Sequence, residues 1–180
     1  MRRSGVTIAE RGGAGRQDAD RRRAGPANAS CYDSGVPTPA GLIVRRATSA
    51  DSRAISALLA ELAYPTDPAE VTSRLAGLGA TGDVALVVER DGALVGLLTL
   101  HQTRFLHRPP DARMTSLVVT SPARGQGAGR RLVAAAETLA REWGCARLEV
   151  TSGFRLREAY GFYERLGFEH NAQRFVKPLA

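Results

Sequence analysis

The chain has 180 residues, 43% of them hydrophobic, and a formal net charge of +7. This length is typical of one domain with a tail, and the apolar content is sufficient for a substantial core. No apolar run approaches the roughly 18 residues that a membrane helix needs, and no apolar segment follows the basic N-terminus. We therefore expect a cytoplasmic protein without a membrane partner. The two cysteines, Cys31 and Cys145, form neither a disulfide framework nor a metal-ligand cluster, so no metal site is predicted.

Residues 1–41 have the composition of a solvated tail. They are rich in Gly, Ala, Arg, Ser and Pro, and they lack apolar periodicity. They contribute +3 of the net charge and the remainder +4, so the body of the protein is only mildly basic. Such a body suits a small anionic ligand, whereas only the Arg-rich tail would favour nucleic acid. We expect a disordered tail over residues 1–41 and a folded domain over residues 42–180, and we do not expect nucleic acid as a partner.

The folded part begins with a short β-branched run at residues 42–44, and two helices follow. Thr48 and Asp51 fit a helix-capping pattern. Apolar residues at helical spacing continue from it, at Ile55, Leu58, Leu59 and Leu62. The second helix begins at Asp67 and Pro68, as its capping residue and its first-turn proline.

Three strands come next, at residues 84–89, 94–100 and 114–120. Asp91 and Gly92 form a two-residue hairpin signal between the first two strands. A long amphipathic helix is predicted over residues 127–143, followed by a strand at 148–151 and a short helix at 158–166. Residues 168–178 predict one or two closing strands. This order of elements indicates an α+β sheet with helices on both faces.

A glycine-rich turn between the third strand and the long helix carries the most chemical information. It reads Arg124-Gly125-Gln126-Gly127-Ala128-Gly129. Backbone N–H groups in the first turn of a helix have no internal partner, and the helix dipole adds partial positive charge there. A phosphate group can bind to these amides, and glycine lets it approach the backbone closely.

Two other phosphate-binding motifs fit this turn less well. In a dinucleotide fingerprint, a third glycine belongs where Arg130 stands, although Glu149 lies near the expected acidic position. The P-loop pattern lacks its Gly-Lys-Ser/Thr sequence. A structural turn without a ligand is a further alternative, which the flanking strand and helix disfavour.

The same segment resembles the signature R/Q-x-x-G-x-G/A of the GNAT superfamily of N-acetyltransferases, with Arg124, Gly127 and Gly129 at the defined positions. A second segment, from Ala159 to Phe168, is similar to the superfamily pattern A-x-x-F-Y-E-x-x-G-F. The two segments follow in the right order and at the right spacing. The resemblance covers residues 42–180 and implies a mixed, mostly antiparallel sheet of six to seven strands.

The resemblance implies acetyl-CoA as co-substrate. The strand residues Leu117, Val118 and Val119 are then expected along the pantetheine arm, with the N–H of Val119 polarising the acetyl carbonyl. The segment from Arg124 to Gly129, Gly125 included, is then expected to grip the cofactor, with the pyrophosphate on the amides from Gln126 to Gly129 and with Arg124 and Arg130 adding charge nearby. Tyr163 matches a tyrosine that protonates the departing thiolate, and Glu149 resembles a glutamate that acts as general base in some members.

The resemblance leaves the acceptor open. A primary amine of a small molecule is the leading hypothesis, and a protein N-terminus or lysine is the alternative within the same chemistry. A third hypothesis is a non-catalytic module that binds acyl-CoA, because the sequence offers no clear general base. Homodimer formation also remains open.

Overall fold

The computed structural model describes residues 41–152, 157–171 and 175–179. The expected tail therefore lies outside the described residues, except for Gly41. Five strands form one sheet in the order β1-β2-β3-β4-β5. These strands are β1 (Leu42–Arg46), β2 (Val84–Arg90), β3 (Ala93–Thr103), β4 (Asp111–Val119) and β5 (Arg147–Val150).

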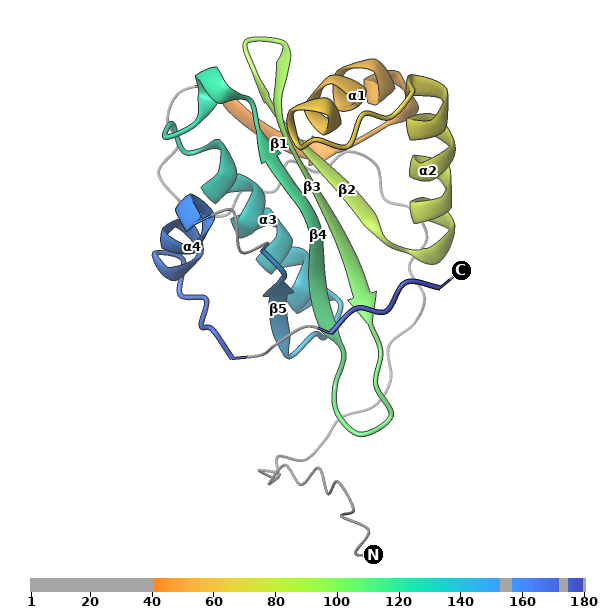
Figure 1. Cartoon of the computed structure of the whole chain (residues 1–180), viewed down its shortest axis with the longest axis vertical. Coiled ribbons are helices and arrows are strands. Elements are labelled where there is room, and N and C mark those ends of the chain that lie inside the picture. Colours follow the sequence, from red (N-terminus) through yellow and green to blue (C-terminus); the bar gives the residue numbers. More distant parts are fainter. Residues whose placement is uncertain (1–40, 153–156, 172–174, 180) are drawn as a thin grey trace, which may run out of the picture.

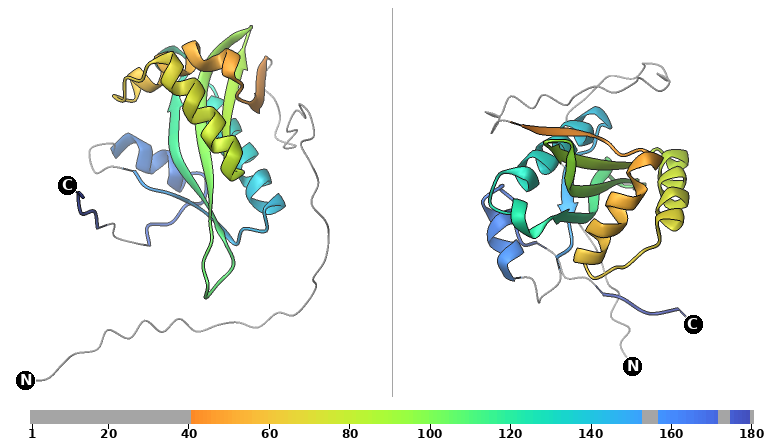
Figure 2. Two further views of the ribbon diagram at one scale, coloured as in Figure 1. Left: turned by 90° about the vertical axis from the view of Figure 1, so that its right-hand side faces the viewer. Right: turned by 90° about the horizontal axis from the view of Figure 1, so that it is seen from above.

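Helices cover both faces of the sheet, as the sequence predicted (Figure 1). The helices are α1 (Ser52–Glu61), α2 (Pro68–Thr81), α3 (Ala128–Glu142) and α4 (Arg157–Glu164), with short 3-10 helices η1 (Ser49–Asp51) and η2 (Ser121–Ala123). Seen from above, α1 and α2 lie on one side of the sheet and α3 and α4 on the other (Figure 2). None of the helices in the described part of the chain has the length and apolar character that crossing a bilayer requires.

Strand alternation divides the core into two layers. Even-numbered residues of β2, such as Leu86 and Val88, pack with α3, whereas Ala85 and Val87 pack with α1 and α2. Both faces of this strand are therefore apolar, which explains why the sequence shows an unbroken hydrophobic run there rather than an alternation.

Local sequence signals fix several element ends. Asp91 and Gly92 both have positive φ, at 49° and 78°, so the turn between β2 and β3 is the predicted hairpin. The Asp67 side chain accepts from the Ala69 N–H at 2.8 Å at the start of α2, which confirms the predicted cap. Gly82 ends that helix in the left-handed conformation.

The predicted closing strands differ from the structure. Within residues 168–171 and 175–179 no strand is present, and residues 172–174 lie outside the described part. The described sheet thus has five strands rather than six to seven. A strand also needs a partner, and the periodic pattern of residues 168–178 does not show which strand would pair with it.

Two features of the sheet shape one edge of β4: a bulge in β4 itself and the separation of β4 from β5. Thr99 of β3 pairs with Ser116, but Leu100 pairs with Met114, so Thr115 is the extra residue of β4. The parallel pairing of β4 with β5 extends only from Asp111 to Met114. The edge of β4 at residues 115–119 therefore has no strand partner on the β5 side among the described residues.

Candidate functional site

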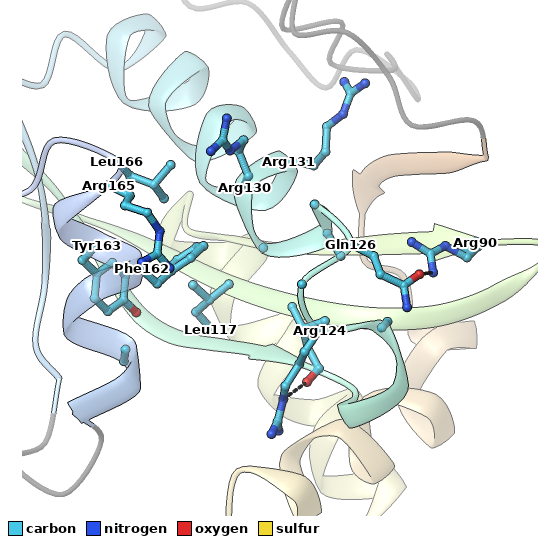
Figure 3. Close-up of a pocket in the computed structure, with 17 residues that line it drawn as sticks. Arg90, Leu117, Arg124, Gln126, Arg130, Arg131, Phe162, Tyr163, Arg165 and Leu166 are labelled. Carbon is cyan, nitrogen blue, oxygen red and sulfur yellow. Dashed lines mark hydrogen bonds between the residues drawn. The ribbon is translucent and has the colours of Figure 1, made fainter.

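The cleft lies where the glycine-rich turn meets the unpaired edge of β4. Its volume is about 1070 Å³, slightly above the range of about 300–1,000 Å³ for small-molecule sites. Residues of β4, the turn, the first turn of α3 and α4 line it (Figure 3). A cleft of this size fits a long ligand better than a compact metabolite.

Most of the predicted cofactor residues come together here. Eight of the nine line the cleft: Leu117, Val119, Arg124, Gly125, Gln126, Gly127, Ala128 and Gly129. Val118 does not, because its side chain is buried with α1 and α2 on the other face of the sheet. The predicted catalytic Tyr163 also lines the cleft, whereas Glu149 lies outside its lining.

The glycine-rich turn needs left-handed backbone at two positions. Gly125 has φ of 74° and Gly127 has φ of 90°, a region that other residues rarely adopt. Gly127 is the N-cap residue of α3, so it begins the helix and has no side chain to cover the amides that follow. Gln126 braces the turn, since its amide nitrogen donates to the Pro122 carbonyl at 2.7 Å and its amide oxygen accepts from Arg90.

At Gly129, close packing and not the backbone conformation excludes a side chain. A Cβ at this position would lie 3.2 Å from Cζ of Phe162 and 3.7 Å from Cγ2 of Val119. The absence of a side chain thus allows α4 to approach the start of α3, with Phe162 between them. Phe162 itself lines the cleft, so this packing shapes the wall of the site.

Arginines surround the cleft, and sequence reasoning identified only two of them. The lining includes Arg90, Arg124, Arg130, Arg131 and Arg165. Arg131 is only 8% exposed, and its Nε and one Nη atom have no hydrogen-bond partner among the described residues. A buried guanidinium without a partner is costly, so this concentration of positive charge fits a ligand with several phosphate groups such as CoA.

Arg124 has a different position from the one expected of a phosphate ligand. Its Nε donates to the Val119 carbonyl at 3.0 Å, and its Nη2 lies 3.8 Å from Oε2 of Glu61 in α1. It extends away from Arg130 and Arg131 (Figure 3). In this structure Arg124 therefore ties the turn to the end of β4 and to α1.

The backbone of β4 directs N–H groups toward the cleft. The Thr120 N–H donates to the Val95 carbonyl at 2.9 Å, on the β3 side. Because successive N–H groups of a strand point to opposite edges, the Val119 N–H points away from β3, toward the side on which β5 separates. The carbonyl of Val119 lies on that side too and accepts from Arg124.

Tyr163 lies in an apolar setting at the wall of the cleft. Its ring makes edge contacts with Phe162 and Phe168, at centroid distances of 5.3 and 5.4 Å. Burial disfavours the phenolate and raises the pKa of Tyr163 above its ordinary value. A phenol is protonated at neutral pH with or without this shift, so Tyr163 is available as a proton donor at the cleft wall.

Glu149 lies in β5, across from β4. Its Oε1 is 3.4 Å from Nη1 of Arg113, and the side chain is 41% exposed. Arg113 also donates to Oγ1 of Thr151 at 3.0 Å. The loop after β5, residues 153–156, lies outside the described part, so the described surroundings of Glu149 consist of this ion pair and the sheet.

Metal ligation finds no support in the described ranges. Residues 41–152, 157–171 and 175–179 contain no group of three or more His, Cys, Asp or Glu residues placed to hold a metal ion.

Comparison with known proteins identifies the family of this arrangement. The model of the Acetyltransferase (GNAT) family matches residues 53–168. An aminoalkylphosphonate N-acetyltransferase of Salmonella typhimurium is 37% identical over 91 residues, which are 50% of this chain and 59% of that protein. An uncharacterized N-acetyltransferase of Bacillus subtilis is 31% identical over 75 residues, 41% of this chain and 53% of that protein. The matches thus span little more than half the length of these relatives.

Solved structures show the same fold. A Trypanosoma brucei acetyltransferase superposes with a TM-score of 0.68 at 24% identity, covering 77% of this chain and 99% of that one. An aminoglycoside N-acetyltransferase solved in complex with CoA superposes with a TM-score of 0.70 at 14% identity, covering 80% and 98%.

Proposed function

Because this chain belongs to the GNAT acetyltransferase family, we propose that it transfers an acetyl group from acetyl-CoA to a primary amine of a small molecule. One observation carries the proposal: the glycine-rich turn at the start of α3 opens directly onto the unpaired edge of β4. A pyrophosphate on the turn and an extended arm along the strand would occupy one continuous cleft. The arginines around the turn support the same ligand.

The turn and β4 would hold the two parts of acetyl-CoA. The amides that follow Gly127 are the donors for the pyrophosphate, with Gly125, Gln126, Ala128 and Gly129 forming the rest of the cradle. Leu117, Val118 and Val119 would contribute backbone groups along the arm, and the outward N–H of Val119 would polarise the acetyl carbonyl. Arg124 would act through the turn that it holds in place.

The chemistry requires one proton donor and one proton acceptor. Acetyl-CoA supplies the thioester that the amine attacks. Tyr163 would protonate the departing thiolate, because it lines the cleft as a neutral phenol. The acceptor ammonium must also lose a proton before it can attack, and Glu149 is the candidate that the family resemblance implies.

The substrate class rests on the relative from Salmonella typhimurium, whose name gives an aminoalkylphosphonate as its acceptor. We therefore favour a small amine over a protein N-terminus or lysine as the acceptor of this chain. Tyr163 favours the catalytic function over the non-catalytic alternative, because a phenol at the cleft wall can protonate a departing thiolate.

Release of free thiol from acetyl-CoA tests the proposal. The acceptor panel should contain aminoalkylphosphonates, other small primary amines, and peptides with a free N-terminus or a lysine. We expect thiol release with small amines and little with peptides. Release with peptides alone would assign the protein alternative, and CoA binding without release on any acceptor would indicate the non-catalytic module.

A further inference from the structure

A hydrogen-bonded pair of His101 and Asp83 lies beside the point where β4 and β5 separate. Nδ1 of His101 in β3 is 3.0 Å from Oδ2 of Asp83, which immediately precedes β2. Asp83 also accepts from the Gln102 N–H at 3.2 Å and from the Thr81 hydroxyl at 2.8 Å. Both members are partly buried, since 31% of the His101 side chain and 16% of that of Asp83 are exposed. The carboxylate is thus fixed from three sides.

This arrangement sets the tautomer of the imidazole. Burial opposes ionisation of Asp83, but the hydrogen bonds from Thr81, Gln102 and His101 outweigh it and hold the pKa of Asp83 below its ordinary value. An ionised carboxylate accepts a proton-bearing nitrogen, so Nδ1 of the neutral ring carries the hydrogen and Nε2 carries the lone pair. Among the described residues, none forms a hydrogen bond with Nε2. A free, oriented lone pair is what a proton acceptor requires.

The register places His101 near the reacting end of the proposed cleft, although His101, like Glu149, lies outside the residues that line it. His101 of β3 pairs with Arg113 of β4, and Arg113 pairs with Glu149 of β5. The next pair, Met114 with Val150, is the last one between β4 and β5. His101 therefore lies level with the point at which β4 and β5 separate, called the apex below. An acyl-pantetheine arm that starts at the turn and follows β4 backwards from Val119 ends toward this apex.

The face of the sheet on which His101 lies is also consistent with a position near the bulge of β4. Leu100 packs with α3, so the neighbouring positions Thr99 and His101 face the side of α1 and α2. Thr99 bonds with the hydroxyls of Thr115 and Ser116, at 2.7 and 2.6 Å, at the bulge of β4. Successive side chains on one face of a strand are about 7 Å apart. His101 thus lies one same-face position along β3 from the residue that contacts the bulge.

We propose that His101, oriented by Asp83, accepts the proton that the ammonium of the acceptor must lose before attack. The proposal rests on the proposed acetyltransferase function and names its base. The ammonium gives one proton to Nε2, and the free amine then forms a C–N bond as the C–S bond breaks. Once the C–N bond has formed, the nitrogen loses its second proton to solvent, and the Tyr163 phenolate left after protonation of the thiolate recovers a proton from solvent. One proton per turnover leaves through His101 to solvent.

This arrangement places the acid and the base on opposite faces of the sheet. Tyr163 packs against the layer that contains α3, and His101 faces the side of α1 and α2. The amine would therefore approach from one face while the thiolate is protonated from the other. The charged groups around His101 are Asp83, Arg113 in the facing strand, and Glu149 behind Arg113.

His101 fits this role better than the other candidates. Glu149 is engaged by Arg113, whose guanidinium is turned toward β5. Asp111 is 1% exposed and accepts from Arg108 and Arg147, at 2.7 and 3.4 Å. The hydroxyls of Thr115 and Ser116 are too weakly basic to accept a proton at neutral pH. In His101, by contrast, Nε2 has no hydrogen-bond partner among the described residues, and histidine is the side chain that most often acts as a general base.

Steady-state kinetics of His101→Asn, with the best small amine from the thiol-release panel, test the proposal. Asparagine keeps an N–H for Asp83 but has no basic nitrogen. We expect kcat to fall by about 10²- to 10⁴-fold, while the Kd for CoA stays unchanged. The rate of the variant should rise with pH until the free amine predominates in solution. In His101→Ala, added imidazole should restore part of the activity, which a purely structural role would not allow.

Three further variants complete the design. His107→Asn changes an exposed histidine in the loop between β3 and β4 and should leave kcat unchanged. Asp83→Asn keeps an acceptor oxygen for Nδ1–H but removes the charge, so its kcat should fall less than that of His101→Asn. A His101→Asn enzyme within threefold of the wild type, or a hundredfold loss confined to Glu149→Gln, would overturn the proposal and leave the acetyltransferase function standing. A wild type that acetylates no amine would instead overturn the function on which the proposal depends.

Discussion

Gly127 is the residue on which the phosphate cradle depends most directly. It holds φ of 90° at the start of α3, and Gly82 holds φ of 81° at the end of α2, where an added Cβ would meet no atom within 4 Å. The two glycines therefore have nearly the same backbone conformation, but only Gly127 lines the cleft. They provide a matched pair that separates loss of binding from loss of stability.

Gly127→Asn should weaken CoA binding by at least tenfold, because its side chain intrudes on the amides of the first turn of α3. Asparagine tolerates the left-handed conformation better than other residues, so the variant should remain folded. Gly82→Asn is the control, with a similar effect on thermal stability and an unchanged Kd. Isothermal titration with CoA measures the Kd of both variants. An equal Kd for the two variants would mean that the phosphates bind elsewhere.

Tyr163 is the residue at which binding and chemistry should separate. Tyr163→Phe keeps the ring contacts with Phe162 and Phe168 and removes only the hydroxyl. We expect kcat to fall by about 10²- to 10⁴-fold, with the KM for acetyl-CoA nearly unchanged. Stopped-flow measurement of thiol release gives both values. Full turnover by the variant would show that another group, or solvent, protonates the thiolate.

At the scale of elements, an ion pair joins β1 to the start of the first helix. Arg45 donates to both carboxylate oxygens of Asp51 at 2.8 Å, and the Thr48 N–H donates to Oδ2 at 2.7 Å. The hydrogen bonds from Arg45 lower the pKa of Asp51 to about 2, against the opposing effect of burial. The predicted capping of this helix is thus confirmed, with an arginine partner that local patterns do not reveal.

The low pKa makes this contribution to stability depend on pH. A depressed carboxyl pKa stabilises the fold above the pKa of the unfolded chain, near 3.9, and the effect is lost as pH falls toward 2. Asp51→Asn should lower the free energy of unfolding by about 2 kcal/mol at pH 7. The difference from the wild type should shrink between pH 4 and pH 2. Urea denaturation followed by circular dichroism measures it.

The exposed pair of Glu70 and Arg74 in α2 provides the control for Asp51. Its side chains are 52% and 62% exposed, so Glu70→Gln should cost less than about 0.5 kcal/mol at any pH. Equal losses in the two variants would contradict the buried role of Asp51.

The elements of this fold were predictable because their signals are local. The hairpin at Asp91 and Gly92, the cap at Asp67 and the stripe of α3 each depend on residues close together in the sequence. The unpaired edge of β4 was not predictable, since it depends on where β5 stops pairing. The same limit applies to the pair of Asp83 and His101, which lie 18 positions apart and meet only through the pairing of β2 with β3.

The candidate site was predictable to the extent that backbone groups form it. The glycine-rich turn and Tyr163 lie at the cleft, as the motifs indicated. Arg90, Arg131 and Arg165 were missed, because an arginine in β2, within α3 or directly after α4 belongs to no motif. The fold brings them to the site, and one usable signal was the excess of arginine over lysine in the chain.

At the scale of the whole molecule, acetyl-CoA should stabilise the fold, because a ligand that binds only the native state adds to its free energy of unfolding. At a hundredfold excess over Kd the gain is about 2.7 kcal/mol, which corresponds to about 5–10 °C in Tm for a domain of this size. Differential scanning fluorimetry measures the shift. NAD, which also carries a pyrophosphate, is the control and should produce no comparable shift. A larger shift with NAD would contradict the CoA assignment.

The edge of β4 at residues 115–119, which has no strand partner on the β5 side among the described residues, should also influence how the protein behaves in concentrated solution. An exposed strand edge is a template on which another chain can add a strand, and this is a common origin of aggregation. Two features of this edge limit such addition: the bulge at Thr115 interrupts its regular spacing, and Arg124 occupies the carbonyl of Val119. A ligand arm along residues 115–119 would cover the remainder. The substrate of the proposed reaction would then also keep the resting protein dispersed.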